Sequence, residues 1–262
     1  MVLKSIIYLL SIILFTITAT AQKSTKEKTD FYRITVYHFS NKEQELLLDE
    51  YLEKALLPAL HKNKFKNIGV FKPVANDTAA DKKIYVYLPS RKLSSLTAID
   101  NLVHADSLYR LAATPYLVAN YDKPPFIRYQ NMLLKAFRLA TEMTLPSLKS
   151  AKAEHIYELR SYESATDSLY RNKVHMFNEG HEIDLFKKMD FNAVFYADVL
   201  MGDRMPNLIY MTCFENMAER NEHWKAFGNS PEWKAISSAP FYQHNVSKVD
   251  IILLHATTYS DF

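Results

Sequence analysis

The chain has 262 residues, of which 48% are hydrophobic and 23% charged, the balance of a globular protein with a sizeable core. Its four glycines argue against the clustered-glycine loops that hold dinucleotides and phosphates. The formal net charge is +3 and both signs are mixed along the sequence. Because no basic stripe could neutralise a row of phosphates, we predict no nucleic acid partner.

The first 21 residues read as a signal peptide. Lys4 precedes the apolar run SIIYLLSIILFTIT, and Ala19-Thr20-Ala21 places small residues at the positions that a signal peptidase reads. The run is shorter than the roughly 20 apolar residues that cross a bilayer. We therefore predict cleavage between Ala21 and Gln22, with a retained anchor as the alternative.

The mature protein is expected to be periplasmic or secreted, and to meet the membrane only through the signal segment before cleavage. Residues 22–30 are polar and are expected to form a flexible lead-in. The single cysteine, Cys213, cannot form an internal disulfide, and no Cys/His cluster has the spacing of a zinc site.

Four strand-like segments recur in the same order at nearly constant spacing. The pairs are FYRITVY (31–37) with IYELRSY (156–162), FKNIGVF (65–71) with FNAVFY (191–196), KIYVYL (83–88) with LIYMTC (208–213), and LLKAF (133–137) with LLHAT (253–257). A repeat of this kind predicts two copies of one structural unit in tandem.

Helices are predicted between the strands of each copy. The capping patterns Ser40-x-x-Glu43 and Ser164-x-x-Asp167 open the first helix of each copy. Pro58 lies within the first of these helices and should kink or shorten it.

A second helix is predicted in each copy, over Leu93–Leu111 and over Asn216–Phe227. Each copy then has the order βαββαβ, which is the ferredoxin-like arrangement of an antiparallel sheet with both helices on one face.

We predict an α+β protein with two tandem ferredoxin-like domains, residues 31–143 and 154–262, joined by a linker at 144–153. Each sheet would leave one face bare, so two copies can bury these faces against each other in a dimeric-type α/β barrel. The sequence leaves open whether the barrel closes within one chain or across a homodimer.

Three motifs of the second copy carry a family resemblance. YELRSY (157–162), SPEWKAI (230–236) and LLHATTYS (253–260) resemble the NIPSNAP family, whose fold is the dimeric α/β barrel. The resemblance is good over residues 155–262 and weaker over 31–140. It implies the fold but no established reaction, cofactor or catalytic residue. A structurally related superfamily includes small monooxygenases and haem-degrading enzymes that use the barrel interior.

Strand alternation divides the segment HIYELRSYES (155–164) into an apolar and a charged face. We expect Tyr157 and Leu159 to pack under the helices, and Glu158, Arg160 and Tyr162 to face the barrel interface. Two interpretations remain open. The charged face is either an ion-pair network that joins the two sheets, with Glu158 held by Arg160 or Arg33, or a pocket in which Arg160 grips an anionic group.

His181 is the other prominent candidate. It falls on an apolar helical stripe running from Tyr170 to Met189, where the first copy has leucine. The histidine is either a hydrogen-bonded core residue or a ligand or general base. Gly180 beside it allows either close packing or room for a ligand.

Aromatic residues of the second copy complete the ligand-pocket candidates. They are Tyr210, Trp224 and Trp233, and the tryptophans are expected either to cover the sheet or to stack on a cofactor. No catalytic motif is present, so no catalytic residue is assigned, and neither a metal nor a cofactor is predicted.

The sequence thus predicts an exported NIPSNAP-like protein of uncharacterised activity, which binds a small apolar or aromatic molecule or serves as an interaction scaffold. The alternative is a monooxygenase- or haem-degradation-like enzyme that uses the barrel interior, with His181, Arg160 and a tryptophan near the ligand. A filled helix–sheet interface favours the first interpretation, and a roomy cavity there favours the second.

Overall fold

The computed structural model describes residues 28–262. The predicted signal peptide and most of the lead-in lie outside the described residues. Within residues 28–262, no helix combines the length and the apolar character needed to cross a membrane.

The described residues contain the order βαββαβ twice. The strands are β1 (Phe31–Phe39), β2 (Gly69–Pro73), β3 (Lys82–Ser90), β4 (Arg128–Ala136), β5 (Ile156–Glu163), β6 (Ala193–Met201), β7 (Asn207–Phe214) and β8 (Lys248–Ala256). The helices are α1 (Lys42–Tyr51), α2 (Leu57–Lys62), α3 (Leu93–Thr97), α4 (Ile99–His104), α5 (Ser107–Ala112), α6 (Thr114–Leu117), α7 (Asp167–Asn178), α8 (Glu182–Lys188), α9 (Met217–Asn229) and α10 (Pro231–Ser238).

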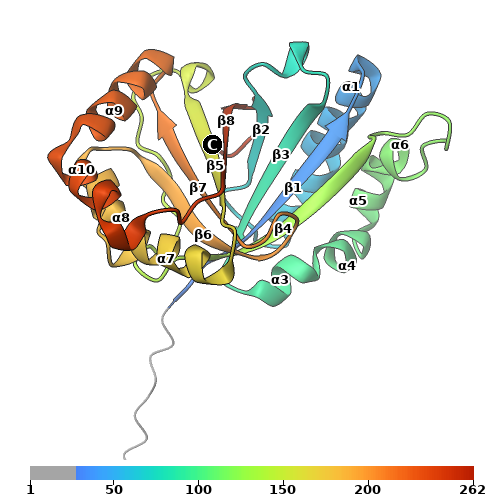
Figure 1. Cartoon of the computed structure of the whole chain (residues 1–262). Coiled ribbons are helices and arrows are strands. Elements are labelled where there is room, and N and C mark those ends of the chain that lie inside the picture. The colour runs from blue at the N-terminus through green and yellow to red at the C-terminus, as the bar shows by residue number, and fades with distance from the viewer. Residues whose placement is uncertain (1–27) are drawn as a thin grey trace, which may run out of the picture.

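The strands form one closed antiparallel barrel in the order β1-β3-β2-β8-β5-β7-β6-β4. Two seams, β2 with β8 and β4 with β6, join the first half of the chain to the second. The barrel therefore closes within one chain, which answers the question that the sequence left open. Helices α1–α6 lie along one side of the barrel and α7–α10 along the other (Figure 1).

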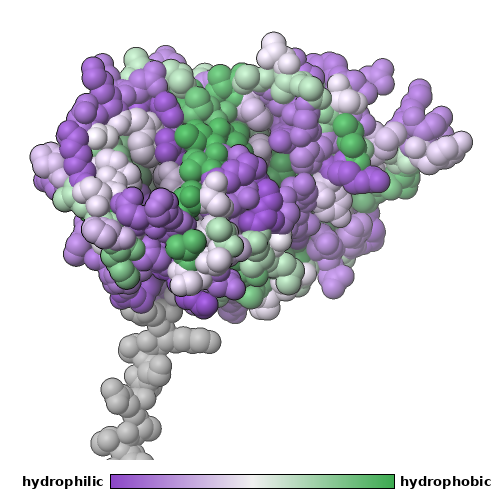
Figure 2. Space-filling model, viewed as in Figure 1, coloured by the Kyte–Doolittle hydropathy of each residue, from purple (hydrophilic) through white to green (hydrophobic). Residues whose placement is uncertain are grey.

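Helices leave part of the barrel wall uncovered. Figure 2 shows a strip of apolar surface between the two helical sides, over the region of β5 and β8. Val249 and Ile251 of β8 are among the exposed apolar residues. Because the barrel needs no second chain, a homodimer would have to use an outer surface of this kind.

Aromatic side chains fill the middle of the barrel. The rings of Tyr87 and Phe195 stack with their centroids 5.0 Å apart, and Tyr32 packs against Phe195 at 4.9 Å. The last residue, Phe262, turns into the same core and packs against Phe71 at 5.4 Å. The C-terminus thus contributes directly to the barrel core.

The expected orientation of the strand faces is wrong. Tyr157 and Leu159 line the barrel interior, whereas Tyr162 belongs to the cluster beneath the helices of the second half. The physical reason is that the barrel interior is enclosed. The barrel interior is walled on every side by strands and takes the uniformly apolar set, while a charged set can find partners on a helix. Alternation separates the two sets but does not say which one faces the helices.

Both predicted helix caps are shifted along the chain. Asn41 accepts a hydrogen bond from the backbone of Gln44, and Thr166 accepts one from Leu169, so these residues cap α1 and α7 in place of the two serines. Ser164 instead donates its hydroxyl hydrogen to the backbone carbonyl of Asn245, which is 81 residues further along the chain.

The helical segments are also more broken than predicted. A π-helical turn, Leu52–Leu56, precedes Pro58 and lets the helix continue as α2. The helix predicted over Leu93–Leu111 is divided into α3, α4 and α5, and Asp106 caps the last of these.

The position of Phe262 leads to a prediction about stability. Phe262 is 5% exposed and surrounded by aromatic rings, so Phe262→Ala should lower the free energy of unfolding by about 3 kcal/mol, the usual cost of such a truncation in a core. Urea denaturation of the mature protein measures this. Phe241→Ala is the matched control, because Phe241 is 64% exposed and its loss should cost less than about 1 kcal/mol. Equal effects of the two substitutions would contradict the burial of the C-terminus.

Candidate functional site

Six of the seven predicted pocket residues meet in one place, between the sheet and the helices of the second half. They are Glu158, Arg160, Tyr162, Tyr210, Trp224 and Trp233. The sequence therefore identified a real cluster. Its members, however, fill the space by contacting one another.

Glu158 is the centre of this cluster and is 0% exposed. Its carboxylate accepts hydrogen bonds from Arg160 Nε at 2.6 Å, Arg220 Nε at 2.7 Å and Trp224 Nε1 at 2.8 Å. Burial by itself favours a higher pKa, but the hydrogen bonds from Arg220 and Arg160 and their positive charge outweigh it and lower the pKa of Glu158. The buried carboxylate is thus ionised and fully satisfied.

The guanidinium of Arg160 is also fully engaged in contacts within the cluster. Its guanidinium lies over the ring of Trp224, 3.5 Å from the ring centre, and Nη1 donates to the Tyr162 hydroxyl at 2.9 Å. The Tyr162 hydroxyl is in turn 2.9 Å from that of Tyr210. The cluster is an ion-pair network, as one interpretation expected, but it joins β5 to α9 instead of joining two sheets. Arg33, the other expected partner, donates to Asn131.

His181 lies elsewhere. The predicted stripe is interrupted between α7 and α8, and His181 has a φ of 64° in this break. Its side chain is 75% exposed and its Nδ1 is 2.8 Å from Oδ2 of Asp184. A Cβ on Gly180 would lie 2.5 Å from the carbonyl oxygen of Met176, so Gly180 serves close packing beside this break. The placement of His181 on a buried face is therefore wrong.

A cavity of about 640 Å³ opens at one end of the barrel, and we call it the barrel mouth. Its walls come from both halves of the chain. The inner, apolar part is formed by Val36, Tyr85, Met132, Leu159, Ile209 and Ile252. The polar rim includes His38, Asp81, Lys83, Gln130, Arg204 and Asp250.

His38 is the rim residue with the most distinctive geometry. Its Nδ1 lies 2.8 Å from Oδ1 of Asp81, and Lys83 Nζ lies 3.1 Å from the other oxygen of that carboxylate. Burial acts in the opposite direction, but the hydrogen bonds from His38 and Lys83 lower the pKa of Asp81. Since a carboxylate only accepts, Nδ1 must be the donor, and in the neutral imidazole Nε2 is then an acceptor.

The Nε2 atom of His38 is buried and has no hydrogen-bond partner within residues 28–262. A buried polar atom without a partner carries a desolvation cost. Elsewhere on the rim, Arg204 pairs with Asp250 and lies 3.1 Å from Glu163, and Lys248 lies within 3.7 Å of both carboxylates, so two cations balance two anions. The mouth is thus lined by a histidine with one unpaired ring nitrogen, above an apolar floor, and a ligand reaches this shielded nitrogen only if neighbouring side chains shift.

Sequence reasoning missed this site, although one signal for it was present. His38 continues the alternation of Tyr32, Ile34 and Val36, and so it had to share a face with an apolar set. Its partner Asp81 is 43 residues away in sequence. No local pattern connects the two.

Solved structures of other proteins share the fold of this chain. A candidate monooxygenase from Fusobacterium nucleatum superimposes with a TM-score of 0.58 at 5% identity, covering 88% of this chain and 93% of that one. A candidate monooxygenase from Lactobacillus acidophilus gives a TM-score of 0.56 at 12% identity, covering 87% and 94%. The chain is therefore a dimeric-type α/β barrel of ferredoxin-like units.

The second half can be placed more narrowly. Residues 157–261 match the NIPSNAP family model, so this part of the chain is similar to NIPSNAP domains. A NIPSNAP-like domain protein from Burkholderia xenovorans is 17% identical, covering 41% of this chain and 90% of that one with a TM-score of 0.37. No curated protein matches the sequence.

The network around Glu158 should respond strongly to loss of its central charge. Glu158→Gln would leave Arg160 and Arg220 without their shared carboxylate, so the free energy of unfolding should fall by about 3 kcal/mol. Chemical denaturation measures this, with Glu50→Gln as control. Glu50 forms an exposed pair with Lys54, and its loss should cost about 0.5 kcal/mol or less. A loss of that small size for Glu158→Gln would contradict the network.

The lowered pKa of Glu158 also predicts how the stability of the protein depends on pH. Because the folded pKa of Glu158 is lowered, its contribution is complete above the unfolded value of about 4.3 and is lost as the pH falls through the folded pKa. The stability difference between the wild type and Glu158→Gln should therefore be constant near neutral pH and shrink below about pH 4. Urea titrations of both proteins from pH 7 to pH 3 measure it. A difference that stays constant over this range would mean that Glu158 is not the titrating group.

Proposed function

We propose that this protein binds a small, largely apolar or aromatic molecule in the barrel mouth. The observation that carries the proposal is the pairing of a cavity of about 640 Å³ with the buried, unused Nε2 of His38. Pockets for small ligands are typically of this size, mostly apolar, and supplied with a few oriented polar groups.

The geometry indicates which polar group the molecule carries. Nε2 of His38 can accept a hydrogen bond from a hydroxyl or N–H group, and Asp81 holds the imidazole in the required tautomer. Tyr85 and Met132 supply the surface for a ring system beneath this contact. The favoured ligand is therefore a hydroxylated aromatic or alicyclic molecule.

A second candidate function is catalysis at the same position. His38 hydrogen-bonded to Asp81 has the arrangement of a general base that a carboxylate orients. Nε2 could remove a proton from an acidic O–H or C–H group of the bound molecule, as an oxygenase that uses dioxygen would require. The structural similarity to the candidate monooxygenases concerns the fold and supports this idea only at that level.

We also propose that the protein acts outside the cytoplasm. The support is the basic residue, apolar run and small residues that precede Gln22. N-terminal sequencing of the mature protein from its native host should begin at Gln22, whereas a sequence that begins near Met1 would indicate a retained segment.

Two related ligands, one with and one without a hydroxyl group, test whether the barrel mouth is a binding site. We expect 2-naphthol to bind to the wild-type protein and to lose affinity by about tenfold in His38→Phe, the worth of one hydrogen bond, while naphthalene should bind both proteins equally. Fluorescence titration measures both. Met132→Trp should fill the cavity and weaken both ligands, and unfolding curves verify that each variant is folded.

His104→Phe is the matched control, since this exposed histidine lies outside the mouth. If 2-naphthol binds Met132→Trp as well as it binds the wild type, the ligand site is not the barrel mouth. If His38→Phe weakens naphthalene as much as 2-naphthol, His38 contributes packing only and the hydrogen-bonding role is wrong.

A further inference from the structure

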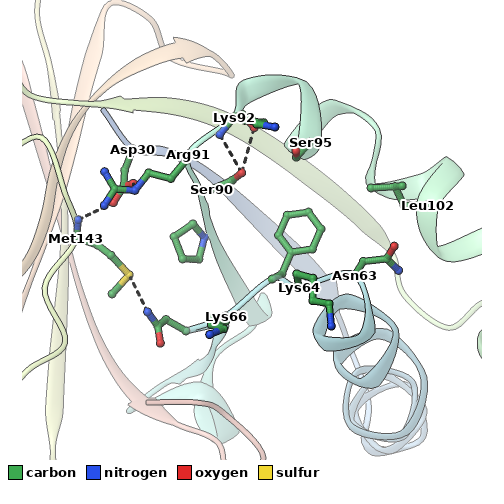
Figure 3. A pocket seen from close by; sticks show the side chains of 13 residues that line it. Asp30, Asn63, Lys64, Lys66, Ser90, Arg91, Lys92, Ser95, Leu102 and Met143 are labelled. Atoms are coloured by element: carbon green, nitrogen blue, oxygen red, sulfur yellow. Dashed lines mark hydrogen bonds and ion pairs between the residues drawn. The ribbon is translucent and has the colours of Figure 1, made fainter. Parts of the chain in front are cut away.

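A second cavity, of about 630 Å³, shares no lining residue with the barrel mouth. It lies between the loop that follows α2 and the segment at the end of β3, beside Met143 (Figure 3). The mouth, in contrast, is lined by residues at the beginning of β3. We call this second cavity the lysine pocket, after Lys64, Lys66 and Lys92.

The lysine pocket has surplus positive charge. Its only acidic lining residue is Asp30, which accepts a hydrogen bond from the Met143 backbone N–H at 2.8 Å and pairs with Arg91 Nε at 3.0 Å. Arg91 also holds Glu142, at 2.7 Å. In Figure 3, Arg91 extends along the cavity toward Asp30. Asp30 and Glu142 therefore share one guanidinium, and their remaining single negative charge is outnumbered by the three lysines.

Among residues 28–262, no carboxylate pairs with any of the three lysines. Within residues 28–262, the side chains of Lys64, Lys66 and Lys92 take part in no ion pair and no hydrogen bond. Lys92 lies on one side of the cavity in Figure 3, and Lys64 and Lys66 lie on the other. The three lysines thus line one cavity from two loops, and their positive charge favours an anion there.

The backbone at Lys64 adds a second argument. Lys64 follows α2 with a φ of 69°, a left-handed conformation that glycine adopts without penalty at the end of a helix. A lysine there costs about 1 kcal/mol relative to glycine. The chain thus holds a cationic side chain at the rim of the pocket at a position where glycine would be more stable.

The lining also includes apolar surface. Phe65 is largely buried beneath the loop, and Pro89 and Met143 lie beside it. A free inorganic ion would leave this surface unused. We infer that the lysine pocket binds a single amphipathic organic anion, an apolar chain or ring that ends in a phosphate or a carboxylate. This inference does not depend on the ligand of the barrel mouth.

Octyl phosphate, used below its micelle concentration, is the probe. Isothermal titration calorimetry should show binding that weakens as salt is raised, and Lys64→Gly should reduce the affinity by about tenfold. This variant relieves the backbone strain, so it should be at least as stable as the wild type in urea. Lys92→Gln should reduce the affinity similarly, whereas Lys234→Gln, an exposed lysine of α10, should leave it unchanged.

Several results would overturn the inference. They are no binding of octyl phosphate at millimolar concentration, unchanged affinity in both Lys64→Gly and Lys92→Gln, and inorganic phosphate binding as tightly as octyl phosphate. Binding to phosphatidylglycerol vesicles without binding of the monomer would also overturn it, because the positive charge would then serve a membrane surface. Met132→Trp should leave octyl phosphate binding intact, which separates failure of this inference from failure at the mouth.

Discussion

Closure of the sheet within one chain is the constraint on which the rest of the structure depends. The β2–β8 and β4–β6 seams pair every strand on both sides, and they turn two half-exposed sheets into one enclosed interior. The interior must then be filled. Tyr32, Tyr87 and Phe195 do so in the middle, together with the C-terminal Phe262. What remains accessible is the end of the barrel, where the polar and apolar linings of the mouth meet.

The enclosed interior also explains where the charges of β5 had to go. Glu158 could remain ionised only where donors surround it, and a wall of apolar strands offers none. Helix α9 supplies Arg220 and Trp224, so the charged face of the strand packs beneath that helix. The space between α9 and the sheet, which the sequence left open as a pocket, is therefore occupied by a satisfied network.

Much of the fold could be predicted from local sequence patterns, and some of the errors in that prediction were also local. The repeated segments correctly marked strands such as β1 and β5, and alternation separated their two faces. The caps at Asn41 and Thr166 were missed because neighbouring serines compete for the same role. The prediction that His181 lies on a buried helical face was wrong because it assumed one continuous helix. The chain instead takes a left-handed conformation at His181, next to the tightly packed Gly180.

The sequence by itself determined the two βαββαβ units, the similarity of the second unit to NIPSNAP domains, and the grouping of Glu158 with Arg160 on one strand face. These features depend on periodicity and on residues close together in the chain. Only the tertiary structure decided which face points inward, since that depends on whether the sheets close into a barrel. It also decided the two cavities. His38 meets Asp81 across a strand pair, a contact that no spacing in the chain encodes, and Lys64 and Lys92 line the same cavity from two different loops.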